Sequence, residues 1–450
     1  MNNVKNNGVF FLKFNKFFIV LVVLLAGFLL VNASAATELD DSVIADDASS
    51  NQDINVNDVD NKVKAGDAGS DINKLGDGEK NFAYLNDLIQ TTPEGGEVIL
   101  DADIKYVPSE DSAFKNGVVV NKSITINGNN SFINGSNLAR IFNVTADNVV
   151  IKNLSFIGGA ATEAGTVYWS GANGSIVNCT FNDNVFSSDD VLTIITWDGV
   201  NGSLVNCTFS NNNFNINLTK EDGDLSIITW NGVNGSIINS TFKEIYFNLD
   251  EETENMRHDA LILCNGNYNI ISGCTFNNIT TNMLYLISWN LSEYNNINDC
   301  SFNDITIKNI LNVIYVVSSP YSVIENNTFN NISASAIISL ISNANIINNC
   351  NFNNYNTAFG VIMLNSASRE DYITNCTFNN GKGVGINLGS RSLRISIIDC
   401  TFNNNSQSVN DNFPESGGDA IFVIASNNVS IVRCSFNDNK LYREGDFGGY

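Results

Sequence analysis

The sequence predicts an all-β protein, a parallel β-helix solenoid of about a dozen coils behind a short capping helix. A core segment, Asn-Cys-Thr-Phe, recurs at residues 178–181, 206–209 and 375–378. A bend-forming residue stands beside it in most repeats, and further short apolar segments accompany it. Repeats of about 20 to 50 residues with a strand-like core are typical of solenoids. Because no helical segment separates the strands, the pattern indicates a parallel β-helix.

The repeated core defines two short strands that meet at a bend. The residue two places before each Phe, most often Cys, lies on the same strand face as that Phe. The residue before the Cys position is usually Asn, Asp or Gly, which tolerate positive φ, so a sharp bend is expected there. An Ile two residues further back is expected in the core. The aligned phenylalanines follow one another at intervals of 23 to 34 residues: Phe132, Phe156, Phe181, Phe209, Phe242, Phe276, Phe302, Phe329, Phe352, Phe378, Phe402 and Phe436.

A third apolar strand lies about ten residues before the Cys position. Trp169, Trp197 and Trp230 share one column of this strand, and Trp289 falls one place off it. The column also contains Cys264, Val317, Leu340 and Ile424, which favours core over a stacked sugar platform. The opposite face is also rather apolar and requires a partner, a ligand or a covering loop. It contains Ile194, Ile227 and Leu261 and our candidate binding residues, Tyr168, Thr196, Thr229 and Leu263.

These coils resemble those of right-handed, pectin-lyase-like β-helix proteins. The run of Asn-Cys-Thr-Phe-Asn coils behind an acidic leader is similar to the adhesin-like surface proteins of methanogenic archaea. The resemblance covers roughly residues 80–450 and implies a right-handed coil and a role in cell adhesion. It says little about activity, because this fold hosts lyases, hydrolases, phage tailspikes and adhesins alike.

The N-terminal segment has the pattern of a secretory signal peptide over residues 1–35. Lys5, Lys13 and Lys16 precede the apolar run 17–31, and Ala35 ends a small-x-small cleavage signal. The alternative is an uncleaved segment that anchors the protein in the membrane. Either interpretation predicts an extracellular or cell-surface protein. Residues 36–80 are rich in Asp, Asn and Ser, which predicts a disordered acidic spacer.

The folded domain is expected to span residues 81–450, with an N-terminal cap and first coil over residues 81–128. Phe82, Leu85 and Ile89 fall at helical spacing before Pro93 and predict a short amphipathic helix. The resemblance implies that this helix caps the first coil. At the other end, residues 444–450 resemble the start of a new strand. We therefore expect a chain that stops inside a coil, either truncated or completed by a partner.

Charge and cysteine content restrict the partners and the chemistry. A net charge of -24 excludes a nucleic-acid binder of the usual basic kind. Extracellular glycans or surface proteins of other cells are the expected partners. The nine cysteines are expected to be buried and unbridged, since stacked strands place them about 4.8 Å apart and a disulfide needs a Cβ separation of about 3.8 Å. His258 is the only histidine, which argues against a Cys/His metal site.

Asparagines in Asn-x-Ser/Thr sequences have two predicted roles. Asn178 and Asn206, at the bend, are expected to form a hydrogen-bonded ladder inside the corner. Asn173, Asn201 and Asn234 precede Gly-Ser in loops, where we expect glycosylation.

Acidic residues gather in three successive spacers and suggest hard-cation binding, with Ca²⁺ the best match to flexible carboxylate loops. A solvated acidic rim is the alternative. No other cofactor is expected. The candidate ligands are Asp189, Asp190, Glu221, Asp222, Asp224, Asp250 and Glu251.

No catalytic residue is assigned from the sequence. The pair Asp189-Asp190 and the segment Arg257-His258-Asp259 are the nearest candidates, and neither lies in a catalytic motif. The sequence therefore predicts a secreted, non-enzymatic, adhesin-like protein. A polysaccharide lyase or glycoside hydrolase is the first alternative, and a structural stalk of a larger surface protein is the second.

Overall fold

The computed structural model describes residues 75–76, 78–160, 165–186, 193–216, 225–249, 259–282, 284–308, 312–365, 368–410 and 420–444. The chain divides into residues 1–64 and 65–450, and every described residue belongs to the second unit. The predicted signal peptide and most of the acidic spacer lie outside the described residues. Among the described residues, no helix has the length and apolarity needed to cross a membrane.

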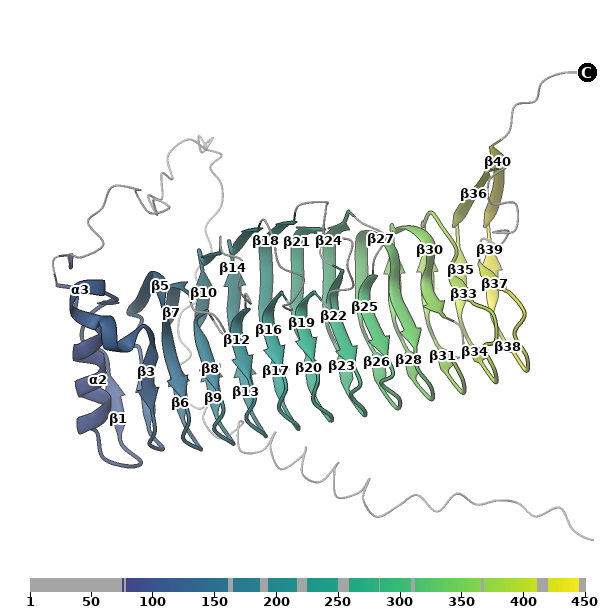
Figure 1. Cartoon of the computed structure of the whole chain (residues 1–450). Helices are drawn as coiled ribbons and strands as arrows, with labels where there is room; N and C mark the ends of the chain where they lie inside the picture. The colour runs from purple at the N-terminus through teal and green to yellow at the C-terminus, as the bar shows by residue number, and fades with distance from the viewer. Residues whose placement is uncertain are drawn as a thin grey trace, which may run out of the picture. The chain divides into compact units, whose positions relative to one another are not determined.

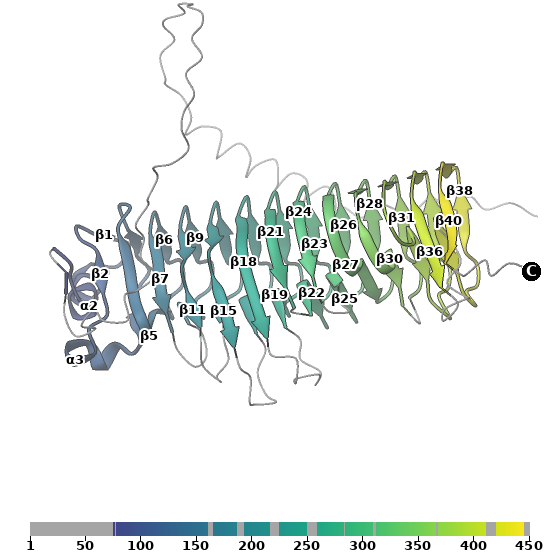
Figure 2. The same cartoon turned by 90° about the horizontal axis from the view of Figure 1, so that it is seen from above.

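A helix covers the N-terminal end of the solenoid, as predicted. Helix α2 (Phe82–Thr91) begins at Asn81, whose side chain accepts a hydrogen bond from the Tyr84 amide at 3.0 Å. The buried carboxylate of Asp111, at the end of helix α3 (Pro108–Asp111), accepts hydrogen bonds from the backbone amides of Phe82 and Ala83 at 3.2 and 2.9 Å. A 3-10 turn (Ser112–Phe114) follows α3. Figures 1 and 2 show α2 beside β1, where it shields the first coil.

The first sheet contains one strand from each coil, and all neighbouring strands in it are parallel. Its 13 strands agree with a solenoid of about a dozen coils. They are β1 (Glu97–Ile99), β4 (Thr125–Asn127), β6 (Val150–Lys152), β9 (Ser175–Val177), β13 (Ser203–Val205), β17 (Ser236–Ile238), β20 (Ile270–Ser272), β23 (Asn296–Asn298), β26 (Val323–Glu325), β28 (Ile346–Asn348), β31 (Tyr372–Thr374), β34 (Ser396–Ile398) and β38 (Ser430–Val432).

The 25-stranded second sheet forms the other two sides of the coils and is also parallel. One side has β2 (Ile104–Lys105), β5 (Phe132–Val144), β7 (Ser155–Gly159), β10 (Thr180–Asn182), β14 (Thr208–Ser210), β18 (Thr241–Leu249), β21 (Thr275–Thr281), β24 (Ser301–Ile307), β27 (Thr328–Ile341), β29 (Asn351–Asn353), β32 (Thr377–Asn379), β35 (Thr401–Asn403) and β39 (Ser435–Asn437), with β11 (Val185–Phe186) and β15 (Asn213–Ile216) beyond it. The other side has β3 (Asn116–Val120), β8 (Val167–Trp169), β12 (Thr193–Trp197), β16 (Ser226–Trp230), β19 (Ala260–Cys264), β22 (Tyr285–Asn290), β25 (Asn312–Val317), β30 (Asn356–Leu364), β33 (Ile386–Leu388) and β37 (Ile421–Val423), together with the C-terminal parts of β5 and β27. Strands β36 (Ser406–Asn410) and β40 (Lys440–Glu444) form a separate pair.

The phenylalanine column runs through the core as a continuous stack. Successive rings from Phe156 to Phe436 lie nearly parallel, with centroids 4.6 to 5.1 Å apart. The prediction is wrong for the first member, because Ile133 pairs with Phe156 while Phe132 pairs with Ser155. The bend before it uses two residues of positive φ, Asn129 and Asn130, which shifts the register by one.

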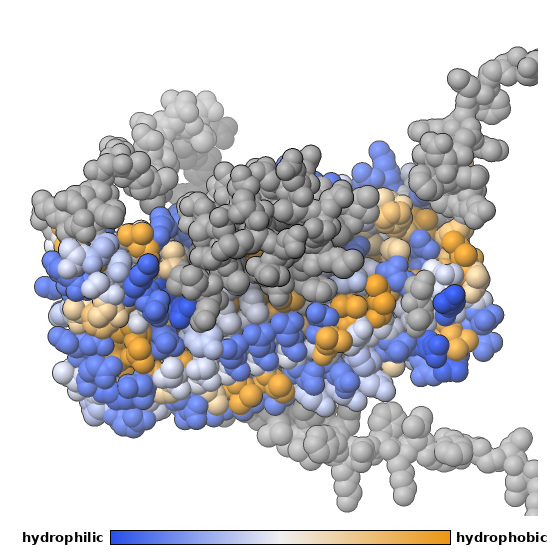
Figure 3. Space-filling view, viewed as in Figure 1, coloured by the Kyte–Doolittle hydropathy of each residue, from blue (hydrophilic) through white to orange (hydrophobic). Residues whose placement is uncertain are grey.

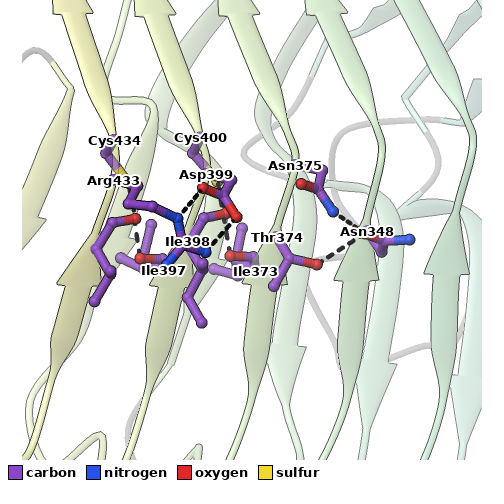
Figure 4. Close-up of polar contacts among 11 residues, drawn as sticks. Asn348, Ile373, Thr374, Asn375, Ile397, Ile398, Asp399, Cys400, Arg433 and Cys434 are labelled. Atoms are coloured by element: carbon purple, nitrogen blue, oxygen red, sulfur yellow. Dashed lines mark hydrogen bonds and ion pairs between the residues drawn. The ribbon is translucent and has the colours of Figure 1, made fainter.

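The predicted bends are confirmed, with φ between 49° and 63° at each bend from Asn153 to Arg433. The asparagine ladder also exists, but it lies on the outer side of the bend and not inside the corner. Asn206 Nδ2 donates to Asn178 Oδ1 at 3.2 Å, and both residues are exposed. The flanking Ile and Cys side chains already fill the inside. Figure 4 shows the same position at the C-terminal end, where Arg433 donates twice to Asp399 at 2.6 Å.

All nine cysteines are unbridged and eight are buried, as predicted, whereas Cys434 in the last coil is half-buried. Each thiol at the bend donates to the carbonyl two residues earlier, as Cys179 does to Val177 O at 3.3 Å. The thiols therefore act as small core residues that also bond the carbonyl next to the bend.

The tryptophans lie in the core, as predicted. Trp169, Trp197 and Trp230 stack with centroids 4.4 and 4.8 Å apart. Trp289 belongs to the same column, against the prediction, because it pairs with Cys264. The turn after it is one residue longer, so counting back from Cys300 misses the register. The turns after β25 and β37 are also one residue longer. Val316 and Val423 therefore occupy the column in place of the predicted Val317 and Ile424.

The prediction for the opposite face of this strand is wrong in part. Ile194, Ile227 and Leu261 belong to the hydrophobic core, together with the next residue of each strand. Two successive residues thus face inward, and strict alternation fails at this point of the coil. The outer face is correspondingly less apolar than the sequence pattern indicated.

Candidate functional site

The four predicted binding residues form one column, as expected from their spacing. Tyr168 pairs with Thr196, Thr196 with Thr229, and Thr229 with Leu263. Three of them are partly exposed, and one is buried. Leu263 is only 1% exposed, and the Thr229 hydroxyl lies 2.7 Å from the Ser226 hydroxyl.

The N-terminal end of this column is polar. The Tyr168 hydroxyl donates to Asp198 Oδ2 at 2.6 Å, and the Arg140 guanidinium lies 5.5 Å from the centre of the Tyr168 ring. This arrangement fixes the ring by its edge and by a cation–π contact. Tyr168 is therefore held by protein groups.

Further along the rod the same column opens into a hollow of about 470 Å³. The register continues the column through Ser288, Tyr315, Ser339 and Met363. Figure 3 shows apolar groups among hydrophilic residues on this side, in the region that Figure 1 labels β25 and β27. The lining residues come from β22, β25, β27 and β30 and the residue after β30: Tyr285, Asn312, Tyr315, Ser335, Ser339, Ile341, Phe359, Met363 and Asn365.

The hollow exists because a neighbouring column loses its side chains along the rod. The register pairs Tyr285 with Asn312, Asn312 with Ala336, and Ala336 with Gly360. The side chain thus shrinks from a phenol to an amide, then to a methyl group, and then to none. Four strands at about 4.8 Å spacing give the hollow a length of roughly 14 Å along the rod.

Tyr315 forms an aromatic wall of the hollow. Its ring stacks on Tyr285 with centroids 4.2 Å apart and 4° between the planes, so one face is covered. The residue in register on the following coil is Ser339, whose side chain is too small to cover the other face. That face is directed toward the hollow, which both residues line.

The polar groups around this ring are uncharged amides and hydroxyls. Asn365 Nδ2 donates to Ser339 Oγ at 2.8 Å, and Asn387 Nδ2 donates to Phe359 O at 2.7 Å. Burial and then the neighbouring Tyr315 raise the pKa of Tyr285, and burial raises the pKa of Tyr315. Both phenols are therefore neutral donors, and no described lining residue is charged.

The predicted cation ligands cannot be placed, because Asp189, Asp190, Glu221, Asp222, Asp224, Asp250 and Glu251 all lie outside the described residues. Within the described ranges, no group of three or more His, Cys, Asp or Glu residues could hold a metal. Asp259, from the weak catalytic candidates, is 3% exposed and accepts the Leu225 amide at 2.9 Å. Its position is that of a structural carboxylate, and Arg257 and His258 are not described.

A match to a family model supports the β-helix fold over the C-terminal part of the chain. The profile of a family described as "Right handed beta helix region" matches residues 293–448. A mannuronic acid specific polysaccharide family 6 lyase from human gut microbiota is 12% identical, with 82% of this chain and 91% of that chain covered and a TM-score of 0.49. PfbA, a surface adhesin of Streptococcus pneumoniae, is 14% identical (68% and 82% covered, TM-score 0.46). Dettilon tailspike protein is 10% identical (82% and 67% covered, TM-score 0.42). A comparison with curated protein sequences gives no match.

The predicted binding residues lie in the column that continues into the hollow, in coils nearer the N-terminus. The misplaced register of Trp289 hid the fact that Ser288 and Tyr315 continue the column of Thr229 and Leu263. An alignment on the isoleucines of β22 and β25, Ile287 and Ile314, could have found it.

Proposed function

We propose that this protein is a secreted, adhesin-like surface protein that binds an uncharged glycan in the hollow beside Tyr315 without cleaving it. The open face of the Tyr315 ring, next to Ser339 and Asn365, supports this proposal most directly. The surface location rests on the signal-peptide pattern of residues 1–35.

The chemistry of the hollow suits a sugar. One face of a pyranose ring is apolar and packs on an aromatic ring, while its hydroxyls need donors and acceptors at the edge. The Asn365 and Asn312 amides and the Ser335 hydroxyl line the same hollow and offer such groups. An apolar peptide segment would leave these polar groups unpaired, which is costly.

An uncharged glycan fits better than an acidic one. No described lining residue is Lys or Arg, and the chain carries a net charge of -24, which repels uronates. Glycoside hydrolysis usually requires two carboxylates, and none lines the described hollow. The neutral tyrosines, with raised pKa, are poor general bases at neutral pH.

The test compares mannan with polymannuronate, whose sugar units differ at C6, on a wider array of neutral and acidic glycans. We expect the full chain to bind a neutral glycan, and Tyr315→Ala to weaken that binding by about tenfold or more. Tyr372→Ala is the matched control, because Tyr372 is 48% exposed on β31 of the first sheet.

Three results would overturn this function. Release of reducing or unsaturated sugars would establish a hydrolase or lyase. Failure to bind any glycan would favour the structural stalk. Equal binding by the Tyr315→Ala variant would place the glycan site elsewhere.

We further propose that Ca²⁺ binds the acidic spacers, with Asp222 and Asp250 among its ligands. Calorimetric titration with Ca²⁺ should give heat of binding that Asp222→Asn and Asp250→Asn together abolish. A titration without heat would favour the solvated acidic rim.

A further inference from the structure

A second tyrosine stack lies at the turn that leads into the first sheet. Tyr268, Tyr294 and Tyr321 stack with centroids 5.0 and 4.9 Å apart, and their rings are nearly parallel. They are 51%, 44% and 50% exposed. No other exposed stack of three aromatic rings occurs among the described residues.

The turn does not need tyrosines in order to close. In earlier coils its equivalent positions are Asn173, Asn201 and Asn234, which form a hydrogen-bonded ladder. The tyrosines share their backbone conformation, with φ of 59°, 58° and 61°. The turn imposes this left-handed region in the earlier coils as well, and it is less favourable for a bulky residue than for the asparagines of those coils.

This second stack ends at a small residue, as the first one does. The Tyr321 amide donates to Asn343 O at 3.2 Å, which places Ala344 in the next position of the column. A methyl group cannot cover a phenol ring, so the C-terminal face of Tyr321 is open. One coil further, Glu370 occupies the column and is ion-paired with Arg394.

The two open ring faces lie at the same boundary between coils. Tyr315 and Tyr321 belong to one coil, and Ser339 and Ala344 belong to the next. Between these positions Val317 pairs with Ile341, which also lines the hollow. The boundary is therefore a step that crosses the rod, with larger rings on the N-terminal side and small residues on the C-terminal side.

We propose that Tyr321 is a second sugar subsite, and that one glycan chain lies across the rod along this step, from Tyr315 to Tyr321. The inference rests on the proposed glycan-binding function of the hollow. Glu370 supplies an acceptor for sugar hydroxyls on the far side of the Tyr321 subsite. The ligand is an uncharged glycan long enough to turn from one outer face of the coil to the next.

The test uses the full chain and neutral β-1,4-linked gluco- and manno-oligosaccharides, as disaccharides and hexasaccharides. A disaccharide occupies one subsite, whereas a hexasaccharide can reach both. We expect Tyr321→Ala to lower hexasaccharide affinity about tenfold and to leave disaccharide affinity unchanged. Tyr321→Phe retains the ring face and should bind as the unaltered chain does.

The matched control is Tyr268→Ala, at the end of the same stack that lies two coils from the step, which should leave both affinities unchanged. Tyr315→Ala should weaken both ligands. Circular dichroism and melting curves verify that the variants fold. If Tyr321→Ala does not fold, the affinities of Tyr321→Phe and Tyr268→Ala decide whether the stack has a structural role.

Unchanged hexasaccharide affinity in Tyr321→Ala overturns the second subsite while leaving the hollow intact. If Tyr268→Ala loses as much hexasaccharide affinity as Tyr321→Ala does, the stack has a structural role. A loss of hexasaccharide affinity in Tyr321→Phe would have the same meaning. If Tyr315→Ala has no effect, or no oligosaccharide binds, the proposed function itself fails.

Discussion

The same turn of the solenoid is filled in two different ways in its two halves. In the coils of β8, β12 and β16 the inward position of the turn is glycine, and an indole ring occupies the space. In the coils that end at β20 through β31 the same position carries polar side chains: Asn269, Asn295, Ser322, Asn345 and Asp371. All five are at most 3% exposed.

Each way of filling the turn imposes its own requirement. A Cβ added at Gly202 would lie 2.1 Å from Trp197 Nε1, so the indole demands glycine. The polar side chains instead form hydrogen bonds from coil to coil. For example, Asn345 Oδ1 accepts a hydrogen bond from the Ser322 backbone amide at 3.0 Å. An aromatic corner is thus filled by the indole of its own coil, although Trp197 Nε1 and Trp230 Nε1 have no hydrogen-bond partner among the described residues, whereas a polar corner bonds to the next coil. The polar row ends at Asp371, whose Oδ2 has no partner among the described residues.

The largest expected effect is at this end of the polar row. Burial raises the pKa of Asp371 to about 7, against about 4 in an unfolded chain. The folded state therefore holds the proton between these values, and stability falls as the pH rises through this interval. Asp371→Asn should raise the free energy of unfolding by up to about 4 kcal/mol at pH 8 and change it little at pH 4.

Urea unfolding at both pH values measures this difference. Asp438→Asn, an exposed carboxylate on the last coil, should change stability by no more than about 0.5 kcal/mol at either pH. A gain for Asp371→Asn that is equal at pH 4 and pH 8 would contradict a titrating buried carboxylate.

The second expected effect concerns the aromatic corner. Gly202→Ala should cost about 3 kcal/mol, because the indole is held between two stacked neighbours and cannot move aside. Combining it with Trp197→Leu should recover part of that loss, which a double-mutant cycle measures. Ser322→Ala in the polar corner removes one hydrogen bond and should cost only about 1 kcal/mol. Similar costs at the two sites would mean that the two corners are equally tolerant.

The smallest expected difference is in the cysteine column, which runs through both halves with Leu154, Ser240 and Asn327 in place of Cys in three coils. Burial raises the pKa of Cys207 to about 12, and burial also raises the pKa of Cys376 in the other half. The eight buried thiols should not react with a disulfide reagent at pH 8 before unfolding, and all nine should react afterwards. Rapid reaction of Cys179 and Cys207 alone would reveal that the aromatic half opens first.

The repeat made the solenoid, its bends and its core columns predictable, and helical spacing made the N-terminal helix predictable, because each depends on local spacing. Turn length and side-chain packing were not predictable in the same way. The extra residue after Trp289 moved its strand by one position, and the paired inward residues Ile194 and Ile195 broke the alternation. The hollow depends on four residues from four coils, Tyr285, Asn312, Ala336 and Gly360, whose sizes matter only once they are stacked.

The amide rows of the rod also have a direction. On the outer surface each asparagine donates toward the preceding coil, as Asn201 does to Asn173 and Asn403 does to Asn379. In the interior the direction is mixed. Asn184 donates to Asn212 and Asn405 to Asn439 in the following coil, whereas Asn212 and Asn405 also donate to Phe181 O and Phe378 O in the preceding coil. The interior amide dipoles therefore partly cancel along the axis, unlike the aligned dipoles of an α-helix. The interior rows can lengthen coil by coil without building up the opposite partial charges that the two ends of a helix carry.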